Sequence, residues 1–236
     1  MTKIALVIPA RDEEACIQSV VRDFLAAQNK EGSSWFDEIV VGDNGSRDHT
    51  AALARQAGAT VIHEARPGYG SACLAALAHL RTRPEGPPEF VVFADGDGSN
   101  DPRDLAALTE PLLRGYADLV IGVRGYPEDR SSMSFTQRFG NRLACALMRP
   151  VARVAYQDLG PYRAIRWQAL ERLGMCDPNY GWTVEMQLKA VKHGLRVREV
   201  LVRNHDRIGG ASKVSGTVRG VLGAGYKIIS TIARYR

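Results

Sequence analysis

The chain has 236 residues, 45% hydrophobic and 24% charged, so it is long enough to bury a large core. Its formal net charge of +5 suits an anionic ligand or a membrane surface. An aromatic content of 7% and no early block of Lys or Arg argue against nucleic acid.

The four cysteines have neither CxxC nor zinc-ligand spacing, which indicates reduced thiols. The N-terminal apolar run is too short for a signal peptide, and no run approaches the ~18 apolar residues of a membrane span. We therefore expect a cytoplasmic protein that meets a membrane, if at all, peripherally at its inner face.

Strands and helices alternate through residues 1–123. Short apolar runs rich in β-branched residues predict buried strands over 3–9, 38–42, 60–63, 90–94 and 118–122. Apolar residues at helical spacing predict helices over 17–25 and 49–57, a third ending near residue 80 and a fourth beginning at Pro102. This alternation with short loops predicts a doubly wound, mostly parallel α/β sheet.

The second half is less regular. Its pattern predicts helices over 137–148, 167–173 and 182–193, a strand over 195–203, and a polar, turn-rich segment over 158–163. From residue 217 an apolar stripe bordered by Arg and Lys predicts an amphipathic helix. That helix could lie on a membrane surface, pack on the core or form a homodimer interface.

Two aspartates with one glycine between them follow the apolar run 90–94. On an extended chain, Asp95 and Asp97 point the same way, so their charges repel unless a cation lies between them. Mg²⁺ or Mn²⁺, bound by one or two carboxylates and by substrate phosphates, fits this arrangement. An EF-hand is excluded because Asn100 replaces its glycine and Ala106 its glutamate. A polar turn without a metal is the alternative.

Other polar loops should open at the same edge of the sheet, because ligands bind at the carboxyl ends of parallel strands. Arg11–Glu13 follows the first strand and Asp43 ends the second. Asp43 could bind ribose hydroxyls or a base, or form only an Asx turn. Gly68 and Gly70, at a helix start, could let backbone N–H groups approach an anion or a sugar.

Cations and one carboxylate of the second half complete the candidate set. Arg207 and Lys213 flank a Gly-rich loop that could close over a diphosphate. Arg124 and Arg138 could likewise bind phosphate oxygens. Glu185, on the first turn of a predicted helix, could be a general base or an acceptor contact, or could interact only with the helix dipole.

Taken in chain order, these motifs resemble those of the family 2 glycosyltransferases of GT-A fold, most closely those of the dolichyl- or polyprenyl-phosphate sugar synthases. The resemblance covers nearly the whole chain and rests on VIPARDE, VVGDNGSRDHT, RPGYGSAC, ADGDGSNDP, IGVRG, TQRFGN, DLGPYRAIR, GWTVEMQLKA and DRIGGASKVSGT. The chain departs from the family pattern at three places. The paired aspartates read Asp43-Asn44, the Tyr-Asn of the first motif reads Arg11-Asp12, and the segment at Asp158 lacks Ser-Gly-Phe.

The resemblance implies a Rossmann-like GT-A sheet with a C-terminal acceptor-side α/β segment. It implies an inverting, metal-dependent hexosyltransferase that takes a sugar from a donor of the GDP-mannose or UDP-glucose class to a polyprenyl or dolichyl phosphate. The implied nucleotide contacts are Pro9, Arg11, Glu13, Asp43, Asp95, Arg207 and Lys213. Asp95, Asp97 and Ser99 would hold Mg²⁺ or Mn²⁺. The implied acceptor contacts are Arg124, Arg138, Asp158, Arg163 and Trp182, and the implied catalytic residues are Asp97, Arg124 and Glu185.

Other readings stay open. A soluble or protein hydroxyl acceptor would require a general base, for which Glu185 and Asp158 are the candidates. A nucleotidyltransferase usually has a Gly-rich basic loop after its first strand, where this chain has Ala10–Glu13. A non-catalytic nucleotide-sugar-binding module is the third. With no visible linker, we treat 1–236 as one domain: a nucleotide-binding half (1–123), an acceptor half (124–216) and a C-terminal helix (217–236).

Overall fold

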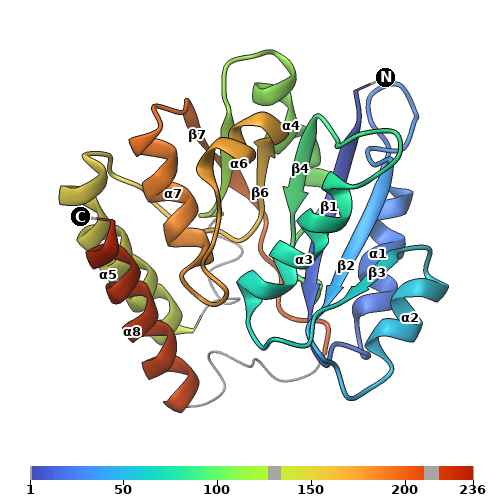
Figure 1. Cartoon of the computed structure of the whole chain (residues 1–236), viewed down its shortest axis with the longest axis horizontal. Helices are drawn as coiled ribbons and strands as arrows, with labels where there is room; N and C mark the ends of the chain where they lie inside the picture. The colour runs from blue at the N-terminus through green and yellow to red at the C-terminus, as the bar shows by residue number, and fades with distance from the viewer. Residues whose placement is uncertain (1, 127–133, 210–217, 236) are drawn as a thin grey trace.

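The central strand of the sheet separates two apolar cores in the computed structural model, which describes residues 2–126, 134–209 and 218–235. Ala5 and Val7 of β1 (Ile4–Ala10) pack on one side, beneath α3 (Tyr69–Arg81), α6 (Trp167–Leu173) and α7 (Trp182–Lys192). Leu6 and Ile8 pack on the other side, against α1 (Ile17–Ala26) and α4 (Leu105–Leu113). Helices therefore cover both faces of the sheet (Figure 1).

In the described part of the chain, seven strands form the sheet, with β1 near its middle. Their order is β3 (Thr60–His63), β2 (Glu38–Asp43), β1, β4 (Phe90–Phe93), β6 (Arg163–Arg166), β5 (Leu119–Arg124) and β7 (Val197–Val202). Only β6 is antiparallel to its neighbours, β4 and β5. The predicted doubly wound, mostly parallel sheet is confirmed. The pattern missed β6, because its four residues begin and end with arginine and give no apolar run.

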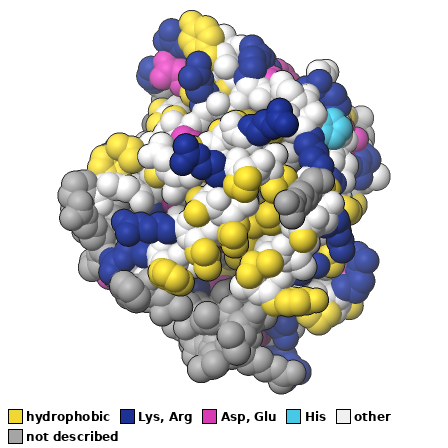
Figure 2. Space-filling view, turned by 90° about the vertical axis from the view of Figure 1, so that its left-hand side faces the viewer, with side chains coloured by type: hydrophobic (Ala, Val, Ile, Leu, Met, Phe, Trp, Pro, Cys, Tyr) yellow, Lys and Arg dark blue, Asp and Glu magenta, His cyan; other side chains and the backbone are white. Residues whose placement is uncertain are grey.

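The remaining helices are α2 (Thr50–Gln56), α5 (Phe135–Ala152) and α8 (Val218–Arg234), with a 3₁₀ turn over Pro102–Asp104. A capping box of Ser134 and Gln137 starts α5, earlier than the predicted residue 137. The two long helices α5 and α8 pack against each other and against α7. Their outer surface faces the viewer in Figure 2. Among the described residues, no helix is both long and apolar enough to cross a membrane.

The carboxyl ends of β1, β2 and β4 meet at one edge of the sheet. Ala10 pairs with Asp43, and Val7 pairs with Phe93, so the three loops that follow these strands lie together. The chain after β7 returns to the same edge. The backbone N–H of Ile208 donates to the carbonyl of Asp97 (3.1 Å), which brings residues 203–209 against the loop after β4.

Candidate active site

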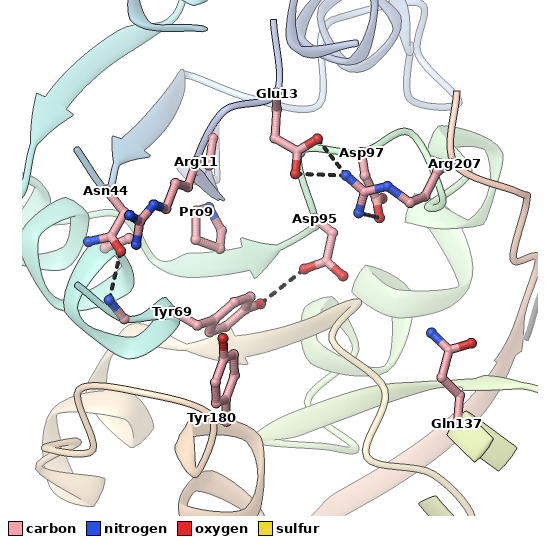
Figure 3. A pocket seen from close by; sticks show the side chains of 14 residues that line it. Pro9, Arg11, Glu13, Asn44, Tyr69, Asp95, Asp97, Gln137, Tyr180 and Arg207 are labelled. Atoms are coloured by element: carbon pink, nitrogen blue, oxygen red, sulfur yellow. Dashed lines mark hydrogen bonds and ion pairs between the residues drawn. The ribbon is translucent and has the colours of Figure 1, made fainter. Parts of the chain in front are cut away.

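A pocket of about 340 Å³ opens at this edge (Figure 3). Its lining comes from seven separate stretches of the described chain: Pro9, Ala10, Arg11, Glu13, Asn44, Gly68, Tyr69, Ala72, Asp95, Gly96, Asp97, Gln137, Tyr180 and Arg207. The predicted nucleotide contacts Pro9, Arg11, Glu13, Asp95 and Arg207 are thus brought together, and Asp97 lies with them. Lys213 lies outside the described residues.

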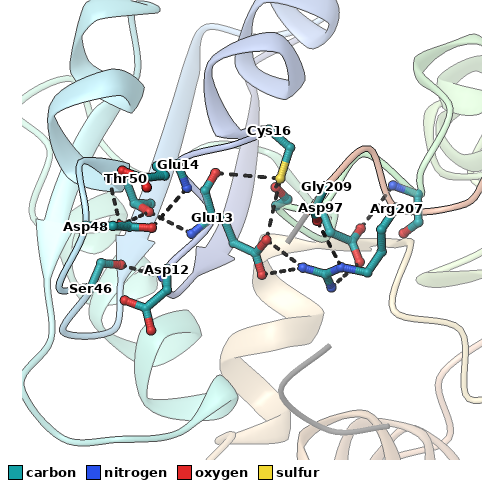
Figure 4. Close-up of polar contacts among 12 residues, drawn as sticks. Asp12, Glu13, Glu14, Cys16, Ser46, Asp48, Thr50, Asp97, Arg207 and Gly209 are labelled. Carbon is teal, nitrogen blue, oxygen red and sulfur yellow. Dashed lines mark hydrogen bonds and ion pairs between the residues drawn. The ribbon is translucent and has the colours of Figure 1, made fainter. Parts of the chain in front are cut away.

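Arg207 joins two carboxylates that are far apart in the sequence. Its Nη2 donates to both oxygens of Glu13 (2.6 and 2.8 Å), and its Nη1 donates to Asp97 (2.8 Å; Figure 4). The side chains of Glu13 and Asp97 are only 10% and 13% exposed, so the guanidinium offsets charges that water screens poorly. Arg207 is therefore the cation that balances the acidic side of the pocket.

A strained turn after β1 orients this cluster. Asp12 has a φ of +50°, in the left-handed region that Asp and Asn tolerate better than most residues. Its N–H donates to Ser46 Oγ (3.0 Å), and its carboxylate accepts the N–H of Arg47 (2.8 Å). The N–H of Glu13 donates to Thr50 Oγ1 (2.7 Å). The loop after β2 thus holds Glu13 where its side chain reaches Arg207 (Figure 4).

Asp95 lies on the floor of the pocket. Its carboxylate accepts a hydrogen bond from the phenol of Tyr69 (3.3 Å; Figure 3), and its N–H donates to Asn100 Oδ1 (2.7 Å). Burial, and then the neighbouring charge of Asp97, raise the pKa of Asp95 to about 7. A divalent cation between the two carboxylates would relieve this repulsion, so these residues fit Mg²⁺ or Mn²⁺.

The rest of a metal's coordination shell would have to come from elsewhere. Within the described part of the chain, no group of three or more His, Cys, Asp or Glu side chains is arranged to hold a metal ion. Ser99, the predicted third ligand, does not line the pocket. Its N–H instead donates to Asp97 Oδ1 (3.0 Å). Two carboxylates completed by diphosphate oxygens and water are the usual coordination for Mg²⁺ at a phosphate site.

Gly68 and Gly70, at the start of α3, allow another segment of backbone to approach closely. A Cβ on Gly68 or Gly70 would clash with the backbone of Asp177 and Pro178. The Pro178 carbonyl accepts the N–H of Ser71 (2.9 Å). These glycines therefore admit the 177–178 backbone, and Gly68 also lines the pocket. Docking of this segment places Tyr180 in the pocket opposite Tyr69 (Figure 3).

Asp43 lies outside the pocket, whereas its neighbour Asn44 lines it. Asp43 is buried outside the pocket, where it accepts the N–H of Ser46 (3.2 Å) and lies 3.0 Å from His63 Nδ1. Asn44 lines the pocket and accepts the N–H of Gly68 (2.7 Å). The structure thus makes Asp43 a loop-positioning residue and brings Asn44 to the pocket.

The expected acceptor contacts are mostly enclosed. Arg124 forms a two-point ion pair with Asp158 (2.6 and 2.8 Å), and neither residue lines the pocket. Arg163 is fully buried and donates to the carbonyls of Leu159 and Gly160. Trp182 is 1% exposed and packs edge-to-face on Phe93. Burial of both side chains, outside the pocket, argues against the prediction that Arg163 and Trp182 contact an acceptor.

Glu185 is also a structural residue. Its carboxylate is fully buried and accepts hydrogen bonds from the N–H groups of Cys176 and Asp177 (3.0 and 2.7 Å). It also accepts from the phenol of Tyr235 (2.9 Å) and pairs with Lys189 (2.7 Å). Although burial opposes ionisation, Lys189 and these donors lower its pKa. A buried, paired carboxylate outside the pocket argues against the predicted general base.

Sequence reasoning missed four polar or aromatic residues of the pocket. Asn44 was noted only as a departure from a paired-aspartate motif. Tyr69, between two glycines, and Tyr180, before the Gly-Trp pair, carried a signal only in their neighbours. Gln137, on the first turn of α5, comes from the opposite wall. Arg138, the next residue, is exposed on α5 and is not among the pocket-lining residues.

The family model of glycosyl transferase family 2 matches residues 5–171. The chain belongs to this family. It is 36% identical over 217 residues to an uncharacterized glycosyltransferase of Mycobacterium tuberculosis, with 92% of each chain covered. It is 28% identical over 220 residues to the undecaprenyl-phosphate 4-deoxy-4-formamido-L-arabinose transferase of Pseudomonas aeruginosa, covering 90% of this chain and 60% of that one.

Solved structures show the same fold for this glycosyltransferase. Glucosyl-3-phosphoglycerate synthase from Mycobacterium tuberculosis, in complex with Mn²⁺, UDP-glucose and phosphoglyceric acid, superposes with a TM-score of 0.77 at 25% identity. The match covers 99% of this chain and 79% of that one. The predicted GT-A fold and glycosyltransferase class are confirmed.

Proposed function

We propose that this glycosyltransferase moves a sugar from a nucleoside diphosphate sugar, of the GDP-mannose or UDP-glucose class, to a polyprenyl phosphate with inversion. The observation that carries this proposal is the meeting of Glu13, Asp95, Asp97 and Arg207 in one pocket at the carboxyl edge of the sheet. Mg²⁺ or Mn²⁺ at Asp95 and Asp97 would neutralise charge on the leaving diphosphate.

The donor would occupy the pocket across its length. Pro9, Arg11 and Asn44 line the pocket beyond the ends of β1 and β2 and would contact the nucleoside. Arg207 also lines the pocket and would bind the diphosphate, because its fork geometry suits phosphate oxygens. Glu13 and Asp97 hold the Arg207 guanidinium from two sides, and this would keep it oriented for the diphosphate.

An acceptor that is already anionic fits the described pocket, whose carboxylates either pair with Arg207 or are the proposed metal ligands. Among the described residues, the carboxylates that line the pocket are Glu13, Asp95 and Asp97. Glu13 and Asp97 pair with Arg207. The two expected bases lie outside the pocket, where Glu185 pairs with Lys189 and Asp158 pairs with Arg124. A lipid phosphate needs orientation more than deprotonation. The Pseudomonas aeruginosa relative, named as an undecaprenyl-phosphate transferase, supports the same acceptor class.

A soluble phosphorylated acceptor is the second candidate. It is favoured by the neighbouring structure that holds phosphoglyceric acid beside UDP-glucose. A phosphoglycerate hydroxyl would require a base, which Asp158 could supply only by leaving Arg124.

A donor and acceptor matrix would test both. UDP- and GDP-sugars are first screened by thermal shift with Mn²⁺ or Mg²⁺, since a ligand that binds only the native state raises Tm. Transfer of labelled sugar is then measured to undecaprenyl phosphate in detergent and to 3-phosphoglycerate. Labelled lipid that disappears in Asp97→Asn supports the proposal. Labelled phosphoglycerate alone would replace it with the second candidate, and binding without transfer would indicate a binding module.

A further inference from the structure

Large apolar side chains are exposed on the outer surface of α5 and α8. Leu143 and Leu147 of α5, and Tyr226 and Ile229 of α8, are between 39% and 77% exposed. The two helices pack side by side, and the exposed pair on each helix is about one turn apart. Figure 2 shows hydrophobic side chains gathered in the middle of this face, with Lys and Arg side chains around them.

The charge of this face has one sign. The sequences of α5 and α8 contain arginine and lysine but neither aspartate nor glutamate. Arg142, Arg149 and Arg153 are exposed along or just after α5, and Arg234 is exposed at the end of α8. A basic border around exposed aliphatic and aromatic side chains is the pattern of helices that lie in a membrane interface.

The inner side of α8 ties this face to the pocket. Lys227 pairs with Asp177 (3.2 Å), and Tyr235 donates to Glu185 (2.9 Å). Pro178, which follows Asp177 in the chain, accepts a hydrogen bond through its carbonyl from the N–H of Ser71 in the first turn of α3. The first residues of α3 line the pocket. Gln137 on the first turn of α5 lines the pocket directly. A surface that held α5 and α8 would therefore hold the pocket in a defined orientation, with its α5 wall beside that surface.

We propose that the α5–α8 face, comprising the exposed residues of these two helices, docks on an anionic lipid bilayer. The apolar side chains would enter the headgroup boundary, as those of interfacial amphipathic helices do. The arginines bind anionic headgroups. The inference deepens the proposed function, because docking would bring a lipid-linked phosphate to the pocket from the membrane side. Docking itself needs neither donor nor acceptor.

Vesicle co-sedimentation of the full chain tests the proposal, without any sugar substrate. The probes are vesicles of phosphatidylcholine alone and vesicles in which about one-third of the lipid is phosphatidylglycerol. The test variants are Arg142→Ser with Arg149→Ser, and Leu143→Asp with Ile229→Asp. The matched control is Leu113→Asp, because Leu113 is 46% exposed on α4, away from this face. Thermal melts check that each variant is folded.

We expect the wild type and Leu113→Asp to pellet with the anionic vesicles and much less with neutral ones. Each arginine removed should weaken the partition about fivefold, because a basic residue near an anionic surface contributes about 1 kcal/mol. Leu143→Asp with Ile229→Asp should abolish pelleting. Wild-type protein that stays in the supernatant, or folded test variants that pellet like the control, would overturn the proposal.

Light scattering separates the competing occupant, a second copy of the chain. A wild-type dimer that becomes monomeric in Leu143→Asp with Ile229→Asp and ignores vesicles would refute bilayer docking. Transfer to a short-chain polyprenyl phosphate in detergent should survive in all these variants. Retained transfer without vesicle binding would sink this inference alone, whereas absent transfer in wild type that binds vesicles would sink the proposed function alone.

Discussion

Replacing Arg207 with glutamine should separate the stability that this residue provides from its contact with the donor. The substitution removes the cation from Glu13 and Asp97 while keeping a polar, uncharged side chain with N–H donors. Losing one partner of a buried ion pair costs about 3–5 kcal/mol. Since the Arg207 side chain is itself 26% exposed, solvent screens part of this, and we expect a loss of about 2–3 kcal/mol. For a chain of this size, that lowers Tm by roughly 5–10 °C.

Catalysis should suffer more than stability. Removing a donor that stabilises developing negative charge typically lowers kcat by about 10²–10³-fold. Nucleoside diphosphate release is measured at saturating donor and acceptor, at a temperature where the variant remains folded. Mn²⁺ alone should also raise the Tm of Arg207→Gln more than that of wild type, because the carboxylates Glu13 and Asp97 then lack their guanidinium.

Arg203→Gln is the matched control. Arg203 lies on the same return segment and pairs with buried Asp104 (2.5 Å), outside the pocket. This variant should lose comparable stability and keep its kcat. If Arg207→Gln retained wild-type kcat, or if Arg203→Gln lost as much activity, the assignment of Arg207 to the diphosphate would be refuted.

Three further substitutions test the floor and the frame of the pocket. The pKa of Asp95 is raised to about 7 from an ordinary 3.8, so metal-free protein should lose stability as pH rises between these values. Asp95→Asn should flatten that dependence in thermal melts with EDTA; an unchanged slope would exclude Asp95 as its source. Tyr69→Phe removes a donor to ionised Asp95 and should weaken Mn²⁺ binding, measured calorimetrically, by about three- to tenfold; unaltered affinity would contradict the contact. Glu185→Gln should lower Tm by several degrees and leave kcat nearly unchanged, because its carboxylate holds backbone N–H groups and α8 rather than substrate; a large loss of kcat with little loss of Tm would restore the general-base role.

Much of the fold could be predicted because its determinants are local. The apolar run Ile4–Pro9 and the helical spacing after Ile17 can each be recognised from neighbouring residues alone. The alternation of strands and helices was predicted from such local patterns. The strand β6 could not be predicted in this way. Arg163 is buried because carbonyls of Leu159 and Gly160 accept its hydrogen bonds, and this compensation is visible only in the folded chain.

The same division applies to the site. Asp95 and Asp97 were predictable as a pair because both follow one strand, and the rule that parallel strands share a carboxyl edge placed Glu13 near them. The ion pairs that join Arg207 to Glu13 and Asp97 were not predictable from local sequence. Arg207 is 194 residues from Glu13 along the chain and reaches it through the return after β7. Glu185 and Arg207 both looked like active-site residues in the sequence. Tertiary packing decided between them, since it encloses Glu185 among backbone donors and leaves Arg207 in the pocket. Sequence alone thus determined which charged residues follow which strands, and the folded structure determined which of those charges meet each other and which still face the cavity.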